Sequence, residues 1–235
     1  MKVTILNVIV CIIIIIFCLY LLFFNDKPVE QKDEFFYDTN EVCQELNNII
    51  PYSKQILDET LQAMNSKWYD WPELELYQNS NSGQWKIFPF FAFGVWELEN
   101  CNKCPIIYKF LKQIPNLKLA TLSKLTAGMK LKPHRGWASH SNHVIRCHYG
   151  LIVPENCYIS VAEGDTEKII YHNKFKWVLF DDSKTHYAEN KSNHDRIVLI
   201  IDVKRPKHIK TGTSTVGDSK ELLEIVDYFR KKYKL

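Results

Sequence analysis

The sequence predicts a mainly β domain with flanking helices, of the double-sheet jelly-roll type. With 235 residues, 46% of them hydrophobic, the chain can form one such domain but not two large separate cores. No helical periodicity interrupts the β-rich region between about residues 119 and 204, which favours an antiparallel sandwich or barrel over a parallel α/β sheet. Turn-prone residues divide that region into the expected strands Val144–Val153, Tyr158–Ala162, Lys168–His172, Trp177–Phe180 and Arg196–Val203.

Apolar residues at helical spacing predict helices on both sides of the β-rich region. Residues 40–64 show this spacing, interrupted by Pro51, which indicates one broken or two short helices. A further short helix is expected over Pro105–Leu111. Near the end of the chain, Asp218 and Glu221 have capping-box spacing ahead of an apolar stripe. An amphipathic helix is therefore expected over about residues 219–233.

The N-terminal segment, residues 1–24, is predicted to be a transmembrane signal anchor. The chain is almost continuously apolar from Val3 to Phe24, which is long enough as a helix to cross a hydrocarbon layer of ~30 Å. A cleaved signal peptide would have a shorter apolar core and a small-residue cleavage site, but this segment ends in Tyr20–Phe24 and has no such site. Residues 25–38 are polar and are expected to form a stalk. Because an acid-rich stretch follows the anchor, a single-pass membrane protein with a lumenal or extracellular domain is expected.

Charge is distributed unevenly along the chain. The formal net charge of +3 is too small to indicate nucleic acid as a partner. Residues 26–100 carry 14 acidic and 5 basic side chains, whereas residues 101–150 carry 9 Lys and Arg and no Asp or Glu. This middle third either meets an anion or forms a solvated basic face.

The cysteines do not predict a disulfide framework. Of the seven, Cys11 and Cys18 lie in the predicted anchor, which leaves an odd number in the domain. Cys101 and Cys104 have the spacing of a zinc knuckle, but no second pair of ligands at similar spacing accompanies them. A local disulfide or two ordinary thiols are both better interpretations than zinc.

Histidines are concentrated in the β-rich region, where seven of the eight lie between residues 134 and 194. Histidine is the commonest ligand of transition metals, so this concentration suggests a metal site, although a single histidine is more often an ordinary surface or core residue. The sequence contains no H-E-x-x-H, G-x-S-x-G, P-loop or G-x-G-x-x-G motif. Zincin, α/β-hydrolase, kinase and dinucleotide-binding functions therefore lack their signatures.

Four short segments follow one another in this region: Lys132–Gly136, Arg146–Leu151, Phe180–His186, and Asp195–Arg196 leading into a hydrophobic strand. In this order and at these separations they resemble the aspartyl/asparaginyl β-hydroxylase family of iron(II)- and 2-oxoglutarate-dependent dioxygenases, over about residues 83–206. The resemblance implies a double-stranded β-helix, the cupin-like jelly roll, over about residues 119–206. It also implies a dioxygenase domain over residues 39–235.

The resemblance also assigns roles to individual residues. His134 and His186 are the expected iron ligands and hence the catalytic residues. Arg196 is expected to bind the distal carboxylate of 2-oxoglutarate, a group that a planar guanidinium suits. The other expected cosubstrate-binding residues are Trp85, Ser123, Arg146 and His148.

Gly136 stands two residues after His134, where many non-haem iron enzymes carry a carboxylate ligand. Glycine has no ligating side chain, so that coordination position would fall to water or to another carboxylate. The family itself has His-x-Gly here and works with two histidines. The interpretation preferred for Asp181 and Asp182 is that they shape the turn before His186, and the alternative is that one of them is an acidic ligand.

The implied reaction needs iron(II), 2-oxoglutarate and dioxygen and hydroxylates an unactivated C–H bond. The expected substrate is the β-carbon of Asp or Asn in a peptide or protein, as Pro133–Gly136 and Phe180–Ser183 favour. Tyr187–Asn190 and Asp202–Pro206 are more similar to the branch of the family that hydroxylates lipid acyl chains, which is the alternative. Val144 also stands where peptide hydroxylases tend to have a second Arg.

A third hypothesis is a non-catalytic, membrane-tethered jelly-roll module that binds an anionic partner. Such a module would be expected to have lost some metal-binding or cosubstrate-binding residues. All the main ones are present in this sequence.

Overall fold

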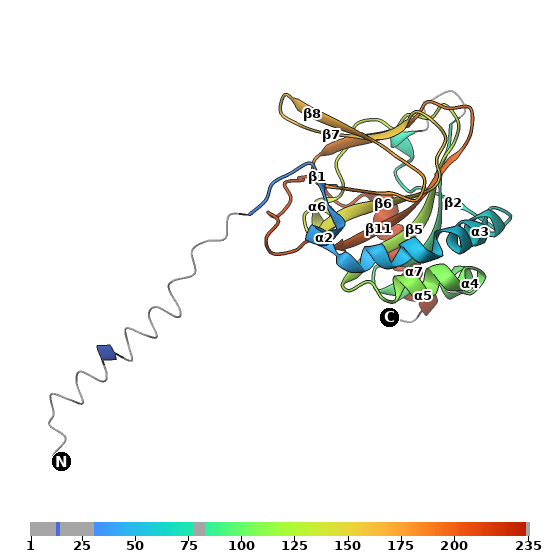
Figure 1. The fold of residues 1–235 in the computed structure, drawn as a ribbon, viewed down its shortest axis with the longest axis horizontal. Coiled ribbons are helices and arrows are strands. Elements are labelled where there is room, and N and C mark those ends of the chain that lie inside the picture. The colour runs from blue at the N-terminus through green and yellow to red at the C-terminus, as the bar shows by residue number, and fades with distance from the viewer. Residues whose placement is uncertain (1–12, 15–30, 78–82, 234–235) are drawn as a thin grey trace, which may run out of the picture. The chain divides into compact units, whose positions relative to one another are not determined.

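A computed structural model of the chain describes residues 13–14, 31–77 and 83–233 (Figure 1). Apart from Ile13 and Ile14, the predicted anchor over residues 3–24 lies outside the described residues, and so does most of the predicted stalk. Within the described ranges, no helix is both long and apolar enough to cross a bilayer. The chain divides into two units. In the smaller one Lys32 forms a parallel bridge with Ile209, and the main unit comprises Asp33–Pro206 and the residues from Thr211 onward.

The main unit contains an eight-stranded antiparallel sheet in the order β1-β9-β6-β11-β5-β3-β2, with β4 paired to β3. The central strands β6 and β11 are buried on both faces, as expected for near-continuous apolar runs. The strands of this sheet are β1 (Phe36–Tyr37), β2 (Tyr69–Asp70), β3 (Trp85–Ala92), β4 (Val95–Trp96), β5 (Leu117–Leu125), β6 (Val144–Ile152), β9 (Trp177–Phe180) and β11 (Arg196–Lys204).

A second, three-stranded antiparallel sheet has the order β10-β7-β8. Its strands are β7 (Cys157–Glu163), β8 (Thr166–Tyr171) and β10 (Thr185–Asn190). Two isolated bridges, Lys130 to Glu189 and His134 to His186, continue this sheet beyond β10. Two stacked antiparallel sheets with flanking helices confirm the predicted mainly β, jelly-roll architecture.

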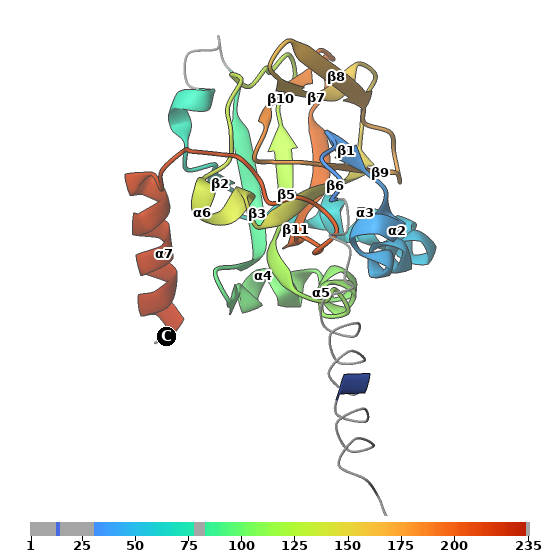
Figure 2. The same cartoon turned by 90° about the vertical axis from the view of Figure 1, so that its left-hand side faces the viewer.

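The helices over residues 39–63 and 98–111 cover the face of the large sheet that points away from β7 and β8 (Figures 1 and 2). Ser53 Oγ lies 2.7 Å from the hydroxyl of Tyr149 in β6, and Trp177 Nε1 donates to the carbonyl of Leu46 at 3.2 Å. The helical segments are α2 (Thr39–Val42), the 3-10 helix η1 (Gln44–Tyr52), α3 (Ser53–Ala63), the 3-10 helix η2 (Leu74–Leu76), α4 (Leu98–Lys103), α5 (Pro105–Leu111), α6 (Ala138–Ser141) and α7 (Lys220–Tyr233).

The sequence predicted three of these helical regions. The broken helix expected over 40–64 is divided into α2, η1 and α3, and Pro51 lies inside the 3-10 segment. Helix α5 has the expected bounds, and α7 begins at Lys220, one residue after the expected start. Helix α4 was not predicted, because its six residues are too few to show a period.

The last part of the predicted stalk belongs to the main unit, so the stalk assignment over residues 25–38 is wrong for this part. Phe36 pairs with Phe180 at the edge of the large sheet, and Lys184 Nζ lies 2.7 Å from Asp33 Oδ1. The physical reason is that the aromatic residues just before Asp38 can be buried against β9.

Cys101 and Cys104 are free, buried thiols in the structure. The first donates to the carbonyl oxygen of Phe90 and the second to that of Glu59. Burial raises the pKa of each thiol to about 12. Of the two interpretations left open by the sequence, the structure has ordinary thiols.

Candidate active site

A pocket between the two sheets brings together all seven residues that the sequence singled out as site residues. Alternate residues of a strand point to one face, so the pocket is built from every second residue of β6, β11 and β10. It is lined by Trp85, Ser123, Leu131, His134, Arg146, His148, Ile159, Phe180, His186, Ala188, Arg196 and Ile200.

His134 and His186 lie side by side. The backbone N–H of His134 donates to the carbonyl of His186 at 3.0 Å, and the reverse bond is 2.8 Å long. Their ring centroids are 4.3 Å apart. Each Nδ1 is close to the carbonyl oxygen two residues earlier, at 2.8 Å from Lys132 and 2.9 Å from Lys184. When Nδ1 carries the proton and donates it there, Nε2 is left as the free ligand atom.

Both imidazoles are in the neutral form that binds a metal. Burial, together with the neighbouring His186, lowers the pKa of His134 to about 3. Burial likewise lowers the pKa of His186 to about 4. Within the described ranges, no group of three or more His, Cys, Asp or Glu side chains is arranged to hold a metal. The donor set is therefore two neutral nitrogens, which suits a borderline transition metal that keeps further positions open.

Asp182 does more than shape the turn before His186. Its Oδ1 lies 3.3 Å from His186 Nε2 and 2.5 Å from Arg146 Nη1, and the side chain is buried. Burial raises the pKa of this carboxyl group, although the charge of Arg146 opposes the shift. Asp181 behaves as expected of a turn residue, because its Oδ1 accepts from the backbone N–H and the hydroxyl of Ser183. The turn interpretation is thus correct for Asp181 and incomplete for Asp182.

Arg146 lines the pocket, but its guanidinium is already engaged. It is the cross-strand partner of Asp202, and its Nε and Nη2 donate to that carboxylate at 2.9 and 2.8 Å. Asp202 also accepts from His140 Nε2 at 2.8 Å when that nitrogen carries a proton. Burial alone would lower the pKa of Arg146, but the charges of Asp182 and Asp202 outweigh it and raise that pKa. Arg146 therefore binds Asp202 and Asp182, and its contact with Asp182 holds that side chain in place.

Arg196 has the opposite surroundings. Its side chain is only 2% exposed, and its Nε and Nη1 have no hydrogen-bond partner among the described residues. Burial lowers the pKa of this guanidinium to about 10, so the group is still charged at neutral pH. A buried cation with unused donors is costly unless an anion joins it. This observation fits the carboxylate of a bound diacid.

The remaining cosubstrate-site residues provide polar atoms in the same pocket. Trp85 Nε1 donates to Ser123 Oγ at 2.9 Å. His148 Nε2 is buried without a partner among the described residues, while its Nδ1 lies 3.2 Å from His172 Nε2.

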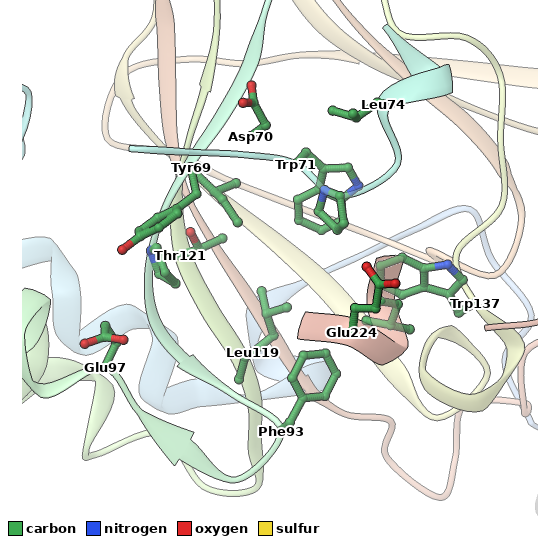
Figure 3. A pocket seen from close by; sticks show the side chains of 15 residues that line it. Tyr69, Asp70, Trp71, Leu74, Phe93, Glu97, Leu119, Thr121, Trp137 and Glu224 are labelled. Carbon is green, nitrogen blue, oxygen red and sulfur yellow. The ribbon is translucent and has the colours of Figure 1, made fainter. Parts of the chain in front are cut away.

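A second, apolar cavity of about 470 Å³ continues along the same face of β3 and β5 (Figure 3). Ile87 pairs with Ser123 and Pro89 with Thr121, so the strands that carry Trp85 and Ser123 extend directly into it. The ring of Trp71, in its wall, stacks on the ring of Trp85 at 4.3 Å. Its other lining residues are Tyr69, Asp70, Pro72, Leu74, Ala92, Phe93, Glu97, Leu119, Trp137, Leu222 and Glu224.

Four residues at or behind the site had no assigned role from the sequence or only a secondary one: Asp182, Asp202, His140 and His172. Asp202 and His140 lie on different elements, β11 and α6, and meet only in the tertiary structure. His172 was counted among the clustered histidines, but the sequence contains no signal that pairs it with His148. The two rings meet across the space between the sheets, because His148 belongs to the large sheet and His172 directly follows a strand of the small one.

The sequence is similar to a known protein family and to several related proteins. The sequence model described as aspartyl/asparaginyl β-hydroxylase matches residues 52–206. The chain is 34% identical over 128 residues to the ornithine lipid ester-linked acyl 2-hydroxylase of Rhizobium tropici, covering 54% of this chain and 44% of that protein. It is 31% identical over 141 residues to aspartate β-hydroxylase domain-containing protein 2 of Mus musculus, covering 53% and 37%. The chain thus spans less than half of the length of either relative.

Solved structures that resemble this fold share less sequence identity with the chain than these relatives do. A prolyl-4-hydroxylase of Pseudomonas putida has a TM-score of 0.43 at 11% identity, covering 67% of this chain and 88% of that one. An oxidoreductase of the 2OG-Fe(II) oxygenase family from Burkholderia pseudomallei has a TM-score of 0.44 at 7% identity, covering 69% and 82%.

Proposed function

Because the chain belongs to the aspartyl/asparaginyl β-hydroxylase family, we propose that it is an iron(II)- and 2-oxoglutarate-dependent dioxygenase that hydroxylates an unactivated C–H bond. One observation carries this proposal. Two neutral imidazoles, His134 and His186, stand in one pocket with Arg196, a buried cation that has unused donors. A metal with open positions and a diacid would complete these groups.

The pocket residues would bind the iron and the cosubstrate through different side chains. His134 and His186 would hold the iron through Nε2, because each Nδ1 is occupied by a backbone carbonyl. Arg196 would bind the distal carboxylate of 2-oxoglutarate, with His148 and Ser123 as further hydrogen-bonding groups. The bound iron, 2-oxoglutarate and dioxygen supply the oxidation chemistry.

The protein's other contribution is orientation and the exclusion of water. Arg146 holds the carboxyl group of Asp182 beside His186, one of the two residues that would hold the iron. Trp85 and Phe180 line the pocket and exclude bulk water from it. Ligands that lie on paired backbone segments keep their geometry better than ligands on free loops.

The apolar cavity favours an acyl chain as the substrate over the Asp or Asn side chain expected from the sequence. Its volume of about 470 Å³ is in the range of small-molecule sites, and its walls are mainly aromatic and aliphatic. The stacked rings of Trp71 and Trp85 form a wall shared by the cavity and the metal pocket. Each CH₂ group buried there would contribute about 0.8 kcal/mol to binding. The acyl hydroxylase of Rhizobium tropici supports the same choice.

The peptide substrate is the second candidate. The description of the family and the aspartate β-hydroxylase domain-containing relatives support it. Against it, none of the described residues that line the cavity is Lys or Arg, so the carboxylate of an Asp substrate would have no cationic partner there.

The test compares the two substrate classes directly. The full-length chain in detergent, loaded with iron(II) and 2-oxoglutarate under air, is incubated with an amino-acyl lipid or with Asp- and Asn-containing peptides. A mass gain of one oxygen atom on the acyl chain supports the proposal, and a gain on the peptide side chain supports the second candidate. His186→Ala is the inactive control, and His194→Ala, at an exposed position, is the matched control variant.

The same assay decides between an enzyme and a binding module. If the full-length chain, His134→Ala and Arg196→Ala all release the same background of succinate and all bind the same amount of iron, the dioxygenase proposal fails. In that case the remaining hypothesis is the non-catalytic jelly-roll module.

Membrane attachment is a further part of the proposal. The apolar segment over residues 3–24 supports a single-pass anchor, and the acid-rich stretch after it supports a lumenal or extracellular domain. An enzyme tethered in this way would have its substrate supplied by the bilayer. Protection of the domain from protease added to sealed vesicles, lost after detergent, would support the orientation. Extraction of the full chain by carbonate alone would contradict the anchor.

A further inference from the structure

Two buried histidines face each other behind the cosubstrate side of the pocket. His148 Nδ1 and His172 Nε2 are 3.2 Å apart, and their rings are nearly parallel with centroids at 5.4 Å. His148 belongs to β6. His172 directly follows β8, where its backbone N–H donates to the carbonyl of Cys157 at 2.8 Å. Each side chain is only 5% exposed.

Both imidazoles are neutral near pH 7, because burial lowers the pKa of each well below the usual range and the charge of Arg196 adds to the shift. A neutral imidazole carries one proton, on either Nδ1 or Nε2. The contact between the two rings needs one donor and one acceptor. The pair can therefore adopt two arrangements. They differ in which ring carries a proton on the nitrogen that points away from the contact.

In the first arrangement His172 Nε2–H donates to His148 Nδ1. His148 then carries its own proton on Nε2, the atom that is buried without a partner at the pocket. In the second, His148 Nδ1–H donates to His172, and a bare lone pair of His148 Nε2 faces the pocket. The second arrangement also leaves the proton of His172 on Nδ1, which has no partner among the described residues.

Only the first arrangement matches an anionic ligand. A carboxylate bound beside Arg196 accepts hydrogen bonds and cannot donate one, so it pairs with an N–H and repels a lone pair. With that carboxylate bound, the first arrangement gives each N–H of the pair an acceptor, whereas the second leaves the buried N–H of His172 Nδ1 without one among the described residues.

We propose that His172 is a positioning residue of the cosubstrate site: its Nε2–H holds His148 in the Nε2–H tautomer, so that the pocket presents a donor to a carboxylate beside Arg196. This inference rests on the proposed function for the identity of the carboxylate. The tautomer itself is measured by NMR on the protein with 2-oxoglutarate bound and without iron, so its reading does not depend on turnover.

The direct test is the protonation of the ring nitrogens by NMR. Full-length protein labelled with ¹⁵N in histidine is studied in detergent with 2-oxoglutarate and without metal, and the signals are assigned by comparison with His148→Gln and His172→Gln. We expect the proton of His148 on Nε2 in the wild type, and its loss from that site or a mixture of tautomers in His172→Phe. A wild-type His148 with its proton on Nδ1 overturns the proposal.

A matched pair of variants separates positioning from structure. His172→Gln places an amide N–H near the position of Nε2, whereas His172→Phe keeps the ring but removes the donor. We expect His172→Phe to raise the KM for 2-oxoglutarate about 5- to 20-fold, with kcat within about 2-fold, the effect of losing one hydrogen bond to a charged group. His172→Gln should restore the KM to within about 2-fold of wild type. His194→Phe, at an exposed site, is the control.

The possible failures are distinguishable. A merely structural role would lower kcat and thermal stability in both variants and leave the tautomer of His148 unchanged, which contradicts the proposal. If the wild type shows the Nε2–H tautomer but consumes no 2-oxoglutarate with any substrate tested, the proposed function fails and the positioning of His148 by His172 stands.

Discussion

The carboxylate of Asp182 occupies the space into which a side chain at Gly136 would project. A Cβ built on Gly136 would lie 2.1 Å from Asp182 Oδ2 and 2.8 Å from Ser141 Cβ. Position 136 is the place where related iron sites carry a carboxylate two residues after the first histidine. In this chain the carboxyl group near position 136 belongs to Asp182, in the turn before His186.

Gly136→Ala is expected to reduce the free energy of unfolding by about 1–3 kcal/mol, because the added methyl group overpacks a site that cannot relax freely. Most of this cost should disappear when Asp182 is also changed to Ala, and the contact with Ser141 should keep a part of it. Urea denaturation of the two single variants and the double variant measures the coupling. Strict additivity would contradict the close approach of the two residues.

His134→Ala and His186→Ala are each expected to reduce bound iron at least 10-fold, because the donor set offers only two nitrogens. The measurement is the metal content after dialysis against a limiting concentration of iron(II). Exposed His143→Ala serves as the matched control and should keep the wild-type content. Equal metal contents in all four proteins would show that the metal lies elsewhere.

Arg196→Gln is expected to raise the KM for 2-oxoglutarate about 10- to 100-fold, the effect of losing charge-assisted hydrogen bonds worth about 1.5–3 kcal/mol. The residual kcat should change less than the KM. The removal of a buried, unpaired cation should also leave the variant at least as stable as the wild type in the absence of ligand. A variant that is unstable and has an unchanged KM would mean that Arg196 has a structural role.

The metal-free protein should lose stability as the pH falls from about 6.5 towards 4. In this window the unfolded chain binds protons on histidines whose folded-state pKa values are depressed: His134, His148, His172 and His186. The free energy of unfolding should therefore decrease by roughly 1.4 kcal/mol per pH unit for each of them. The raised pKa of Asp182 acts in the opposite direction and reduces the total. The free energy of unfolding, measured by urea denaturation at several pH values, should decrease less steeply with falling pH in His172→Phe than in the wild type. An equal pH dependence would refute the assignment.

Filling the apolar cavity should block an acyl substrate without disturbing the metal pocket. Ala92→Trp adds a large side chain to the cavity wall, and Ala127→Trp, at an exposed position outside it, is the matched control. Ala92→Trp should raise the KM for the lipid at least 10-fold while iron content stays at the wild-type level. Unchanged lipid hydroxylation in this variant would exclude the cavity as the acyl site.

The strands that the sequence predicted well are those with dense apolar runs. The run Trp177–Phe180 has the expected bounds, and the run expected at Arg196–Val203 extends by one residue to Lys204. Strand β3 was missed because Pro89 stands inside it, and proline usually argues against a paired strand. The structure accommodates Pro89 through a register shift between Pro89 and Phe91. Strand β10 was missed because its residues are mostly polar.

The seven site residues that line the pocket could be proposed from the sequence because they resemble short family motifs in a fixed order. The residues behind them could not. Asp202 reaches Arg146 through the register of β11 and β6, and the direction of the Asp182 side chain depends on that ion pair. Contacts of this kind depend on which strands are neighbours, and local residue patterns do not contain that information.

The reciprocal backbone bonds between His134 and His186, together with the carbonyl contact of each Nδ1, hold the two rings side by side without a metal. A metal ion would then enter a site that exists before it arrives, unlike sites whose ligands come together only around the ion. Depletion of iron should therefore leave a folded protein that regains activity at the speed of ion binding. The supply of iron to the compartment would thus control how much of the protein is active, without any need for new synthesis.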